Sequence, residues 1–159
     1  MIKNIKTFVI ILVGPPLSGK STWIKNNYPD LKVISRDNIL LEMYGENDYN
    51  KAWKEVDQKA VDKALLLKFQ EANSSNESVI VDMTHMASKR RISNLQYFSD
   101  NYYKICVVFP ILTDDEYSER NKIRTVNENK TISMGIVKSM INSYQVPTKE
   151  EGFNEIIFL

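Results

Sequence analysis

The sequence is short of several features that would place it in a special class of protein. Its 159 residues include a single cysteine, Cys106, so no internal disulfide can form, and glycine and proline number only five each. No apolar stretch approaches the roughly 20 residues of a membrane-spanning helix, so we expect no membrane association. The lone cysteine and the lack of a secretion signal favour a reducing compartment, and we expect a cytoplasmic protein.

An excess of one charge is also lacking. Lysine and arginine number 21, and aspartate and glutamate number 20, which gives a formal net charge of +1. This balance excludes a global positive field that would attract long nucleic acids. A nucleic-acid partner would have to be bound locally, through few phosphates.

The composition and the apolar patterning predict the fold class. Hydrophobic residues make up 43% of the chain and charged residues 26%, typical of a globular domain, and we expect one domain over residues 1–159. Apolar runs predict strands at 8–13, 31–35, 79–81, 103–109 and 156–159. Helical patterns follow at 20–28, 37–43, 51–72, 87–98 and 132–144, and another begins at 113 and ends before a polar loop at 126–131. This alternation predicts an α/β fold of three layers, with a parallel sheet of four or five strands.

A phosphate-binding pattern follows the first predicted strand. Residues 14–21 read GPPLSGKS and match the P-loop motif in full. Glycines let backbone N–H groups surround a phosphate chain, and the next helix offers its positive N-terminus. Lys20 supplies a charge to the β and γ phosphates, and the Ser21 hydroxyl suits a Mg²⁺ ligand, so we expect ATP and Mg²⁺. The candidate nucleotide-binding residues are Gly14, Pro15, Pro16, Leu17, Ser18, Gly19, Lys20, Ser21 and Thr22.

Two aspartates end predicted strands at the sheet edge where ligands bind in parallel α/β folds. Asp37 follows the second strand after Arg36, and a carboxylate there can orient an acceptor hydroxyl and accept its proton. The alternative is that Asp37 only caps a helix. Asp82 ends the third strand in a Walker-B-like pattern, beside the metal or the acceptor. Met83 follows it, where motor-type ATPases usually place a water-activating glutamate, which disfavours simple hydrolysis.

An arginine pair lies on the predicted helix after the fourth strand. Arg120 and Arg124 are spaced i, i+4 and would project from one face. Such arginines can close over a nucleotide as a lid and stabilise charge on the transferring phosphoryl group. The alternative is a solvated helix face that pairs with neighbouring acidic side chains.

These motifs occur in the order typical of one family. GPPLSGKSTW at 14–23, Ser35-Arg36-Asp37, Val81-Asp82 and ERNKIR at 119–124 together resemble the kinase domain of bacteriophage-type 5′-hydroxyl polynucleotide kinases. The resemblance implies a P-loop kinase fold with Asp37 as general base and a lid at about 113–145, whose segment 131–140 helps to hold adenine. It also implies a location in the cytoplasm, including that of a phage-infected host. The implied catalytic residues are Lys20, Asp37, Arg120 and Arg124; Arg120 also contacts the nucleotide, and the acceptor-binding candidates are Arg36, Asp37, Asp82, Thr84 and His85.

The sequence departs from that family at three points. The family carries an arginine three residues after the catalytic aspartate, to bind the acceptor strand's phosphate, where this chain has Leu40. Lys89, Arg90 and Arg91 are candidate substitutes, or simply the polar face of a helix. Met83-Thr84-His85 stands where the family tends toward Thr-Asn. We also expect no phosphatase domain of the kind found in the bifunctional phage enzymes.

Three functions therefore stay open. The first is ATP-dependent phosphoryl transfer to the 5′-hydroxyl end of DNA or RNA, with contacts to the terminal nucleotides only. The second is transfer to a small-molecule hydroxyl, on a nucleoside, sugar or antibiotic, which Leu40 would favour by making the acceptor pocket more apolar. The third is an ATP-binding module without catalysis, which the intact set of candidate residues disfavours.

Overall fold

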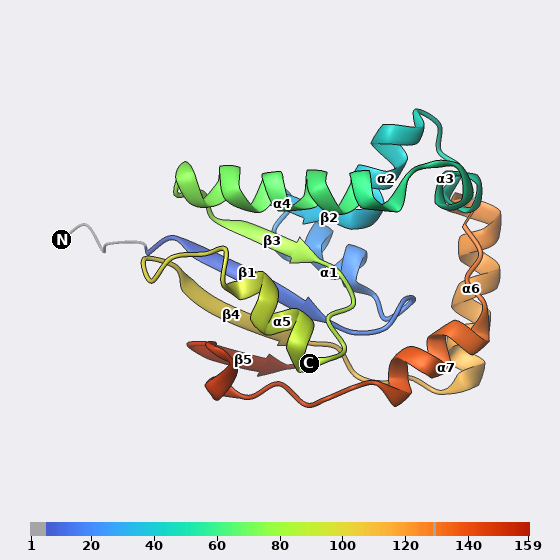
Figure 1. Ribbon diagram of the computed structural model, residues 1–159. Coiled ribbons are helices and arrows are strands. Elements are labelled where there is room, and N and C mark those ends of the chain that lie inside the picture. The colour runs from blue at the N-terminus through green and yellow to red at the C-terminus, as the bar shows by residue number, and fades with distance from the viewer. Residues whose placement is uncertain (1–5, 129) are drawn as a thin grey trace.

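The computed structural model describes residues 6–128 and 130–159 and contains a five-stranded parallel sheet. The strands lie in the order β2-β3-β1-β4-β5. Their carboxyl ends all point to the same edge of the sheet (Figure 1), which confirms the predicted α/β fold class. The strand bounds are β1 (Phe8–Val13), β2 (Lys32–Ser35), β3 (Val79–Asp82), β4 (Tyr103–Val108) and β5 (Glu155–Phe158).

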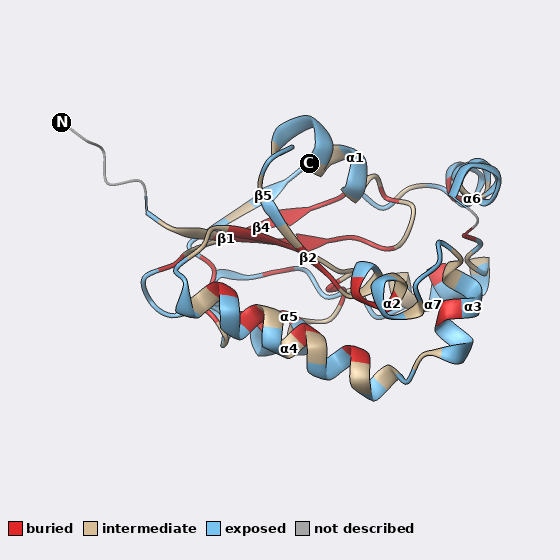
Figure 2. Cartoon of the chain, turned by 90° about the horizontal axis from the view of Figure 1, so that it is seen from above, coloured by how far each residue is buried: buried red, intermediate tan, exposed pale blue. Residues whose placement is uncertain are grey.

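Helices cover both faces of the sheet and extend beyond its carboxyl edge. Figure 2 shows α1 on one face and α4 and α5 on the other, with α3 and α6 beyond the strand ends. The helix bounds are α1 (Lys20–Asn27), α2 (Arg36–Tyr44), α3 (Tyr49–Glu55), α4 (Gln58–Ser74), α5 (Ser88–Leu95), α6 (Asp114–Glu128) and α7 (Met134–Asn142), with a 3₁₀ turn at Lys149–Glu151. No helix in the described part of the chain is long and apolar enough to cross a membrane.

Alternate side chains of β1 divide the core into two clusters. Val9, Ile11 and Val13 point to the face that α4 and α5 cover, and they pack in the larger cluster with Phe69 of α4. The opposite face carries Ile10 and Leu12, which belong to a smaller cluster under α1. Because β1 is buried on both sides, its sequence is a continuous apolar run rather than an alternating one.

The long helix predicted over 51–72 is two helices in the structure. The chain leaves helical geometry at Val56, and the Asp57 side chain accepts a hydrogen bond from the N–H of Lys59 to start α4. The apolar spacing continues across this break, so periodicity alone predicted one element. The break turns α3 away from α4 and places it beyond the strand ends (Figure 1).

Two other helix ends differ from the prediction. Ser35, not Asp37, caps α2, because its Oγ accepts a hydrogen bond from the N–H of Asn38 at 3.3 Å. Asp37 lies in the first turn of the helix and its carboxylate is not used as the cap. Helix α6 extends to Glu128, so the loop predicted at 126–131 begins later.

Candidate active site

The P-loop joins β1 to α1 and its backbone requires two glycines. A Cβ at Gly14 would lie 2.7 Å from Ser18 Oγ and 3.0 Å from Phe109 Cβ, so a side chain there would clash. Gly19 has φ of +96°, in the left-handed region that glycine adopts without strain, and it starts α1. The N–H of Gly14 donates to the carbonyl of Thr84 at 2.9 Å, which fixes the loop against the segment after β3.

Lys20 folds back over the loop that precedes it. Its Nζ donates to the carbonyl oxygens of Gly14 and Pro15, both at 2.9 Å. Burial lowers the pKa of Lys20 to about 8, with Asp82 opposing the shift and Arg124 adding to it. The ammonium group is therefore held inside the loop by two carbonyls, in a place where phosphate oxygens would be far stronger partners.

The P-loop side chains fit a nucleotide with Mg²⁺. Ser18 Oγ is buried and has no hydrogen-bond partner in the described part of the chain, which marks an unsatisfied polar group inside the loop. Ser21 is exposed on the first turn of α1 and is available as a metal ligand. The described residues contain no group of three or more histidine, cysteine or carboxylate side chains that would hold a metal by themselves. That suits Mg²⁺, which takes few protein ligands and completes its shell with water and substrate phosphates.

The lowered pKa of Lys20 predicts that the protein takes up protons when nucleotide binds. With a pKa of about 8, half of the molecules carry an uncharged Lys20 at pH 8, and phosphate binding favours the charged form. ATP binding at pH 8 should therefore take up about half a proton, and uptake should be close to zero at pH 6.5. Calorimetry in two buffers of different protonation enthalpy measures this. The Lys20→Arg variant keeps its charge throughout and should show no proton uptake. If the binding enthalpy of wild type at pH 8 did not depend on the buffer, Lys20 would not be the group that takes up the proton.

The pairing of β2 with β3 brings the two candidate aspartates to one edge. Ser35 lies opposite Asp82 in the register, and Asp37 follows in the first turn of α2. Burial raises the pKa of Asp82, and the charge of Asp37 raises it further while Lys20 opposes the shift. Asp37, Asp82 and Lys20 therefore form one electrostatic cluster at the carboxyl edge of the sheet, next to the P-loop.

Asp37 has two partners that the sequence did not reveal. Lys130, in the loop between α6 and α7, donates from Nζ to Asp37 Oδ2 at 2.8 Å and is largely buried. Tyr49 of α3 lies close enough to Asp37 that burial, together with the charge of this carboxylate, raises the pKa of Tyr49 to about 12. These contacts join α2, α3 and the α6–α7 loop around one carboxylate. Lys130 lies 93 residues from Asp37, within a segment predicted only as a polar loop.

Arg36 is directed toward α4 and α3. Its Nε donates to Asp62 Oδ1 at 2.9 Å and its Nη2 to Gln58 Oε1 at 2.9 Å. The guanidinium also lies over the ring of Trp53, 5.5 Å from the ring centroid. Arg36 precedes Asp37 in the chain, but its guanidinium donors bind side chains of α4.

The arginine pair connects α6 to the P-loop. Arg120 Nη1 donates to the carbonyl of Leu17 at 2.8 Å. Arg124 Nε donates to Glu128 Oε2 at 3.2 Å, and Arg124 is one of the charges that shift the pKa of both Lys20 and Asp82. Its Nη1 is buried without a hydrogen-bond partner among the described residues, as expected for a donor reserved for a ligand.

Helices α6 and α7 form one hairpin. Asn121 donates to the carbonyl of Ile132 at 2.7 Å and accepts from its N–H at 3.2 Å, while Thr125 and Thr131 share a hydroxyl contact at 2.8 Å. These bonds join α6 to the segment before α7, and the Arg120 contact joins α6 to the P-loop backbone. In this arrangement the hairpin lies beyond the carboxyl edge of the sheet (Figure 1).

The structure corrects the expectation for Leu40. This side chain is fully buried in the larger core cluster and does not line an accessible acceptor pocket. Leu40 therefore gives no support to an apolar acceptor site. The cation nearest to Asp37 is supplied instead by Lys130 from the α6–α7 loop.

His85 is a core residue, contrary to the expectation that it binds an acceptor. It is 1% exposed, its Nδ1 donates to the carbonyl of Leu12 at 2.9 Å, and Asn94 Nδ2 donates to its Nε2 at 2.8 Å. Both ring nitrogens are satisfied by a neutral imidazole, and burial lowers the pKa of His85 to about 4. Its neighbour Thr84 does contact the P-loop, through the backbone carbonyl that accepts from Gly14.

The lowered pKa of His85 predicts a loss of stability at mildly acidic pH. Its folded pKa of about 4 lies below the ordinary value of 6.5, so the unfolded state binds more protons as the pH falls from 6.5 toward 4. The free energy of unfolding should be about 2 kcal/mol lower at pH 5 than at pH 7.5. Urea unfolding at both values measures it. His85→Asn is the matched control, because His85 is the chain's only histidine and asparagine tolerates its φ of +47°. In this variant the difference in the free energy of unfolding between the two pH values should disappear.

Arg91 is not available as a substitute for the missing acceptor arginine. It is fully buried, and its guanidinium forms a two-point ion pair with Glu151, at 2.6 and 3.0 Å. The remaining donors bind the carbonyl oxygens of His85, Met86 and Gln145 at 2.8 to 3.0 Å. Arg91 thus ties the loop after β3 to the segment before β5. Lys89 and Arg90 share the same helix, and among the described residues no hydrogen bond or ion pair places them at the candidate site.

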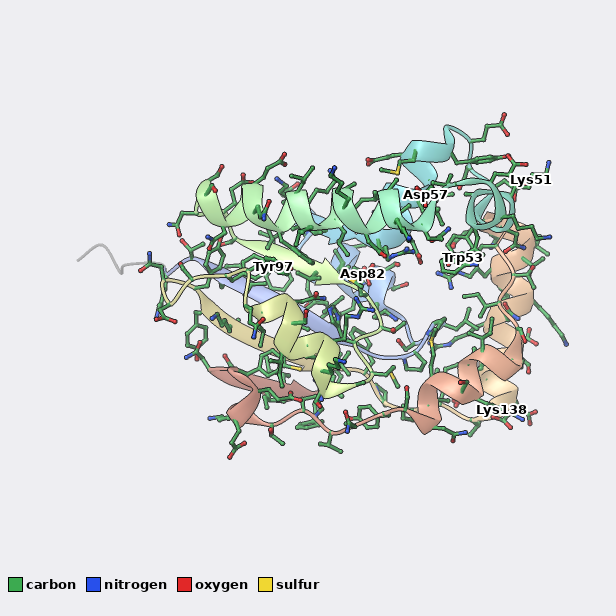
Figure 3. The ribbon with its side chains drawn as sticks, in the orientation of Figure 1. Lys51, Trp53, Asp57, Asp82, Tyr97 and Lys138 are labelled. Atoms are coloured by element: carbon green, nitrogen blue, oxygen red, sulfur yellow. The ribbon has the colours of Figure 1, made fainter. Side chains whose placement is uncertain are left out.

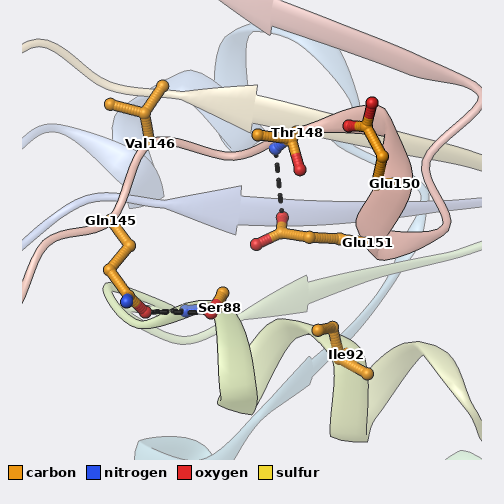
Figure 4. Close-up of a pocket in the computed structure, with 7 residues that line it drawn as sticks. All are labelled: Ser88, Ile92, Gln145, Val146, Thr148, Glu150 and Glu151. Atoms are coloured by element: carbon orange, nitrogen blue, oxygen red, sulfur yellow. Dashed lines mark hydrogen bonds between the residues drawn. The ribbon is translucent and has the colours of Figure 1, made fainter.

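A shallow hollow with a volume of about 350 Å³ lies between α5 and the segment 145–151 (Figure 4). Ser88 donates to Gln145 Oε1 across it, from both its N–H and its hydroxyl, at 2.9 Å. The lining residues include neither Asp37 nor Asp82 nor any P-loop residue. The hollow is therefore separate from the cluster of charged side chains described above.

The fold and the P-loop define a P-loop kinase-like protein, a class that binds nucleotides, typically with Mg²⁺. Over residues 9–147 the chain matches the model of a family described as an AAA domain. This match spans well over half of the chain, so the chain belongs to that family. None of the curated proteins compared with the chain matches it.

Many solved structures share the fold, among them the following three. A chain of the Pnkp1/Rnl/Hen1 RNA repair complex is 17% identical with a TM-score of 0.71, over 89% of this chain and 45% of that chain. Kti12 of Chaetomium thermophilum in complex with ADP-AlF3 is 13% identical with a TM-score of 0.66, over 95% and 88%. A gluconokinase of Sinorhizobium meliloti 1021 is 14% identical with a TM-score of 0.55, over 96% and 81%. This chain spans less than half the length of the first of these, and at such identities the likeness is one of fold.

Proposed function

We propose that the protein transfers the γ-phosphate of ATP to the 5′-hydroxyl end of a nucleic acid. The observation that carries this proposal is the cluster of Lys20, Asp37, Asp82 and Arg124, whose charges act on one another at the carboxyl edge of the sheet. A P-loop lysine, two strand-end carboxylates and a lid arginine are the groups that phosphoryl transfer between oxygens needs.

In the proposed reaction the acceptor 5′-oxygen attacks the γ-phosphorus in line. The new O–P bond forms while the bond from the γ-phosphorus to the β–γ bridging oxygen breaks, and ADP leaves with those electrons. Asp37 orients the hydroxyl and takes its proton. Lys20 and Arg124 stabilise the negative charge on the transferring group, and Arg120 holds the lid on the P-loop backbone. Ser21, with Asp82 nearby, would hold Mg²⁺, which would supply positive charge to offset that of the phosphates.

A nucleic-acid end is favoured over a small neutral acceptor by the charges around Asp37. Lys130 and Arg124 both act on the cluster beside the P-loop, and Lys130 contacts the proposed base itself. An acceptor that carries its own phosphate suits such a site. One of the similar folds is a chain of an RNA repair complex, which agrees with this choice. The gluconokinase fold supports the alternative of a small hydroxyl acceptor.

The direct test is transfer of label from γ-labelled ATP with Mg²⁺ to a 5′-hydroxyl oligonucleotide. The same oligonucleotide with a 5′-phosphate is the control and should stay unlabelled. Label on neither strand, with ATP binding intact, would overturn the proposed acceptor, and a panel of nucleosides and sugars would then identify a small one. Because the proposed contacts are to the terminal nucleotides only, acceptor affinity should depend weakly on salt.

A further inference from the structure

Helix α3 carries an aromatic pair beside the proposed general base. Tyr49 and Trp53 lie one turn apart, with ring centroids 6.3 Å apart and an angle of 30° between the ring planes. Trp53 is 49% exposed, although a tryptophan gains much from burial. Figure 3 shows Trp53 extending from α3 into the region between the sheet edge, where Asp82 ends β3, and helix α6.

Cations flank both rings of this pair. Lys130 Nζ lies 4.0 Å from the centroid of the Tyr49 ring and 2.8 Å from Asp37 Oδ2. The guanidinium of Arg36 lies 5.5 Å from the centroid of the Trp53 ring, and Arg36 precedes Asp37 in the chain. A continuous path of contacts therefore runs from Asp37 through Lys130 and Tyr49 to Trp53. The half-exposed Trp53 ring is therefore connected by contacts to the proposed general base.

An exposed ring among cations has the chemistry that recognises a nucleotide. Aromatic side chains stack on the flat faces of bases whatever their sequence, and neighbouring cations attract the phosphates that accompany the base. A small sugar acceptor would offer Trp53 no aromatic face. A purely structural Trp53–Arg36 contact would not require half of the indole to stay exposed.

We propose that Tyr49 and Trp53 form the acceptor platform, with Trp53 stacking on the terminal nucleobase of the 5′-hydroxyl strand while Lys130 supplies positive charge beside it. This inference rests on the proposed function and narrows its substrate to an end whose terminal base presents a free face, because a base inside a duplex has none for Trp53. It also explains how the protein can select a nucleic acid with a net charge of only +1.

The test compares two single-stranded acceptors in transfer assays, one with a normal 5′-terminal nucleotide and one whose 5′-terminal sugar lacks its base. Wild type should prefer the normal acceptor about tenfold in KM. Trp53→Ala should remove this preference by raising the KM for the normal acceptor only, with the KM for ATP unchanged. Trp53→Phe should retain part of the preference. Asn50→Ala, a change of an exposed neighbour on α3, is the control and should behave as wild type.

Other outcomes would overturn the platform. An equal loss with both acceptors would show that Trp53 does not bind a base, and a raised KM for ATP alone would assign Trp53 to the donor nucleotide. If wild type transfers phosphate to neither strand, the platform is tested by binding alone. Each strand then carries a dye at its 3′ end, and its equilibrium affinity is measured. A preference for the normal strand that Trp53→Ala abolishes would uphold the platform while the proposed transfer fails. Equal binding of both strands, or no binding, would overturn the platform as well.

Discussion

Replacing Asp37 by asparagine should lower phosphoryl transfer about 100-fold or more while the affinity for ATP stays near that of wild type. Asparagine has nearly the same shape and can still accept a hydrogen bond from Lys130, which now contacts Asp37 Oδ2 at 2.8 Å. It cannot take the proton of the acceptor hydroxyl. Lys20 donates to backbone carbonyls of the P-loop rather than to Asp37, so we expect the substitution to change nucleotide binding little. Single-turnover transfer and equilibrium ATP binding measure the two effects.

Asp62→Asn is the matched control, because it removes one acidic charge from an ion pair with Arg36. That variant should retain near-normal transfer. If Asp37→Asn transferred phosphate at a near-normal rate, Asp37 would not be the general base. A large loss in Asp82→Asn alone would then move that role to the carboxylate at the end of β3.

The second large effect concerns stability. Glu151→Gln should destabilise the fold by about 3 to 5 kcal/mol, because it leaves the charge of Arg91 buried without its carboxylate. The side chains of Arg91 and Glu151 are 0% and 6% exposed, and their closest atoms are 2.6 Å apart. Urea unfolding at neutral pH gives the free energy. Glu150→Gln, at the exposed neighbouring position, is the control and should change it by less than about 0.5 kcal/mol.

A double variant separates the charge from the rest of the network. Arg91→Met combined with Glu151→Leu removes both charges, which can restore much of the stability of a buried pair. Here recovery should be incomplete, because the carbonyls of His85, Met86 and Gln145 also lose their donor. If Glu151→Gln were as stable as wild type, Arg91 would have to find another partner or water in the folded state.

Local patterns predicted the strands, the P-loop and the parallel sheet, because those features depend on residues close together in the sequence. The apolar run at 8–13 followed by a glycine-rich loop is sufficient to place β1, the loop and α1. The division of the helix predicted over 51–72 could not be predicted from apolar spacing, because the break depends on the Asp57 side chain capping a new helix. That break matters for function, because it gives α3, with Tyr49 and Trp53, its position beyond the strand ends.

Partners that are distant in the sequence account for the contacts, in the site and in the core, that could not be predicted. Lys130 meets Asp37 across 93 residues and Arg91 meets Glu151 across 60. Each basic residue stood in a polar stretch that reads equally well as a solvated surface. Their burial depends on tertiary packing that places a carboxylate opposite them, and no local pattern encodes that packing. His85 was assigned to the acceptor site for the same reason, since its two hydrogen-bond partners come from β1 and α5.

The solitary imidazole of this chain also provides a natural spectroscopic reporter. Its Nδ1 is bonded to the carbonyl of Leu12, two residues before the glycine at which the P-loop begins. Ring nitrogen chemical shifts depend on tautomer and hydrogen bonding, and no other histidine overlaps with this signal. Selective ¹⁵N labelling of histidine would therefore follow the strand end under the P-loop through each stage of ligand binding, without any added probe.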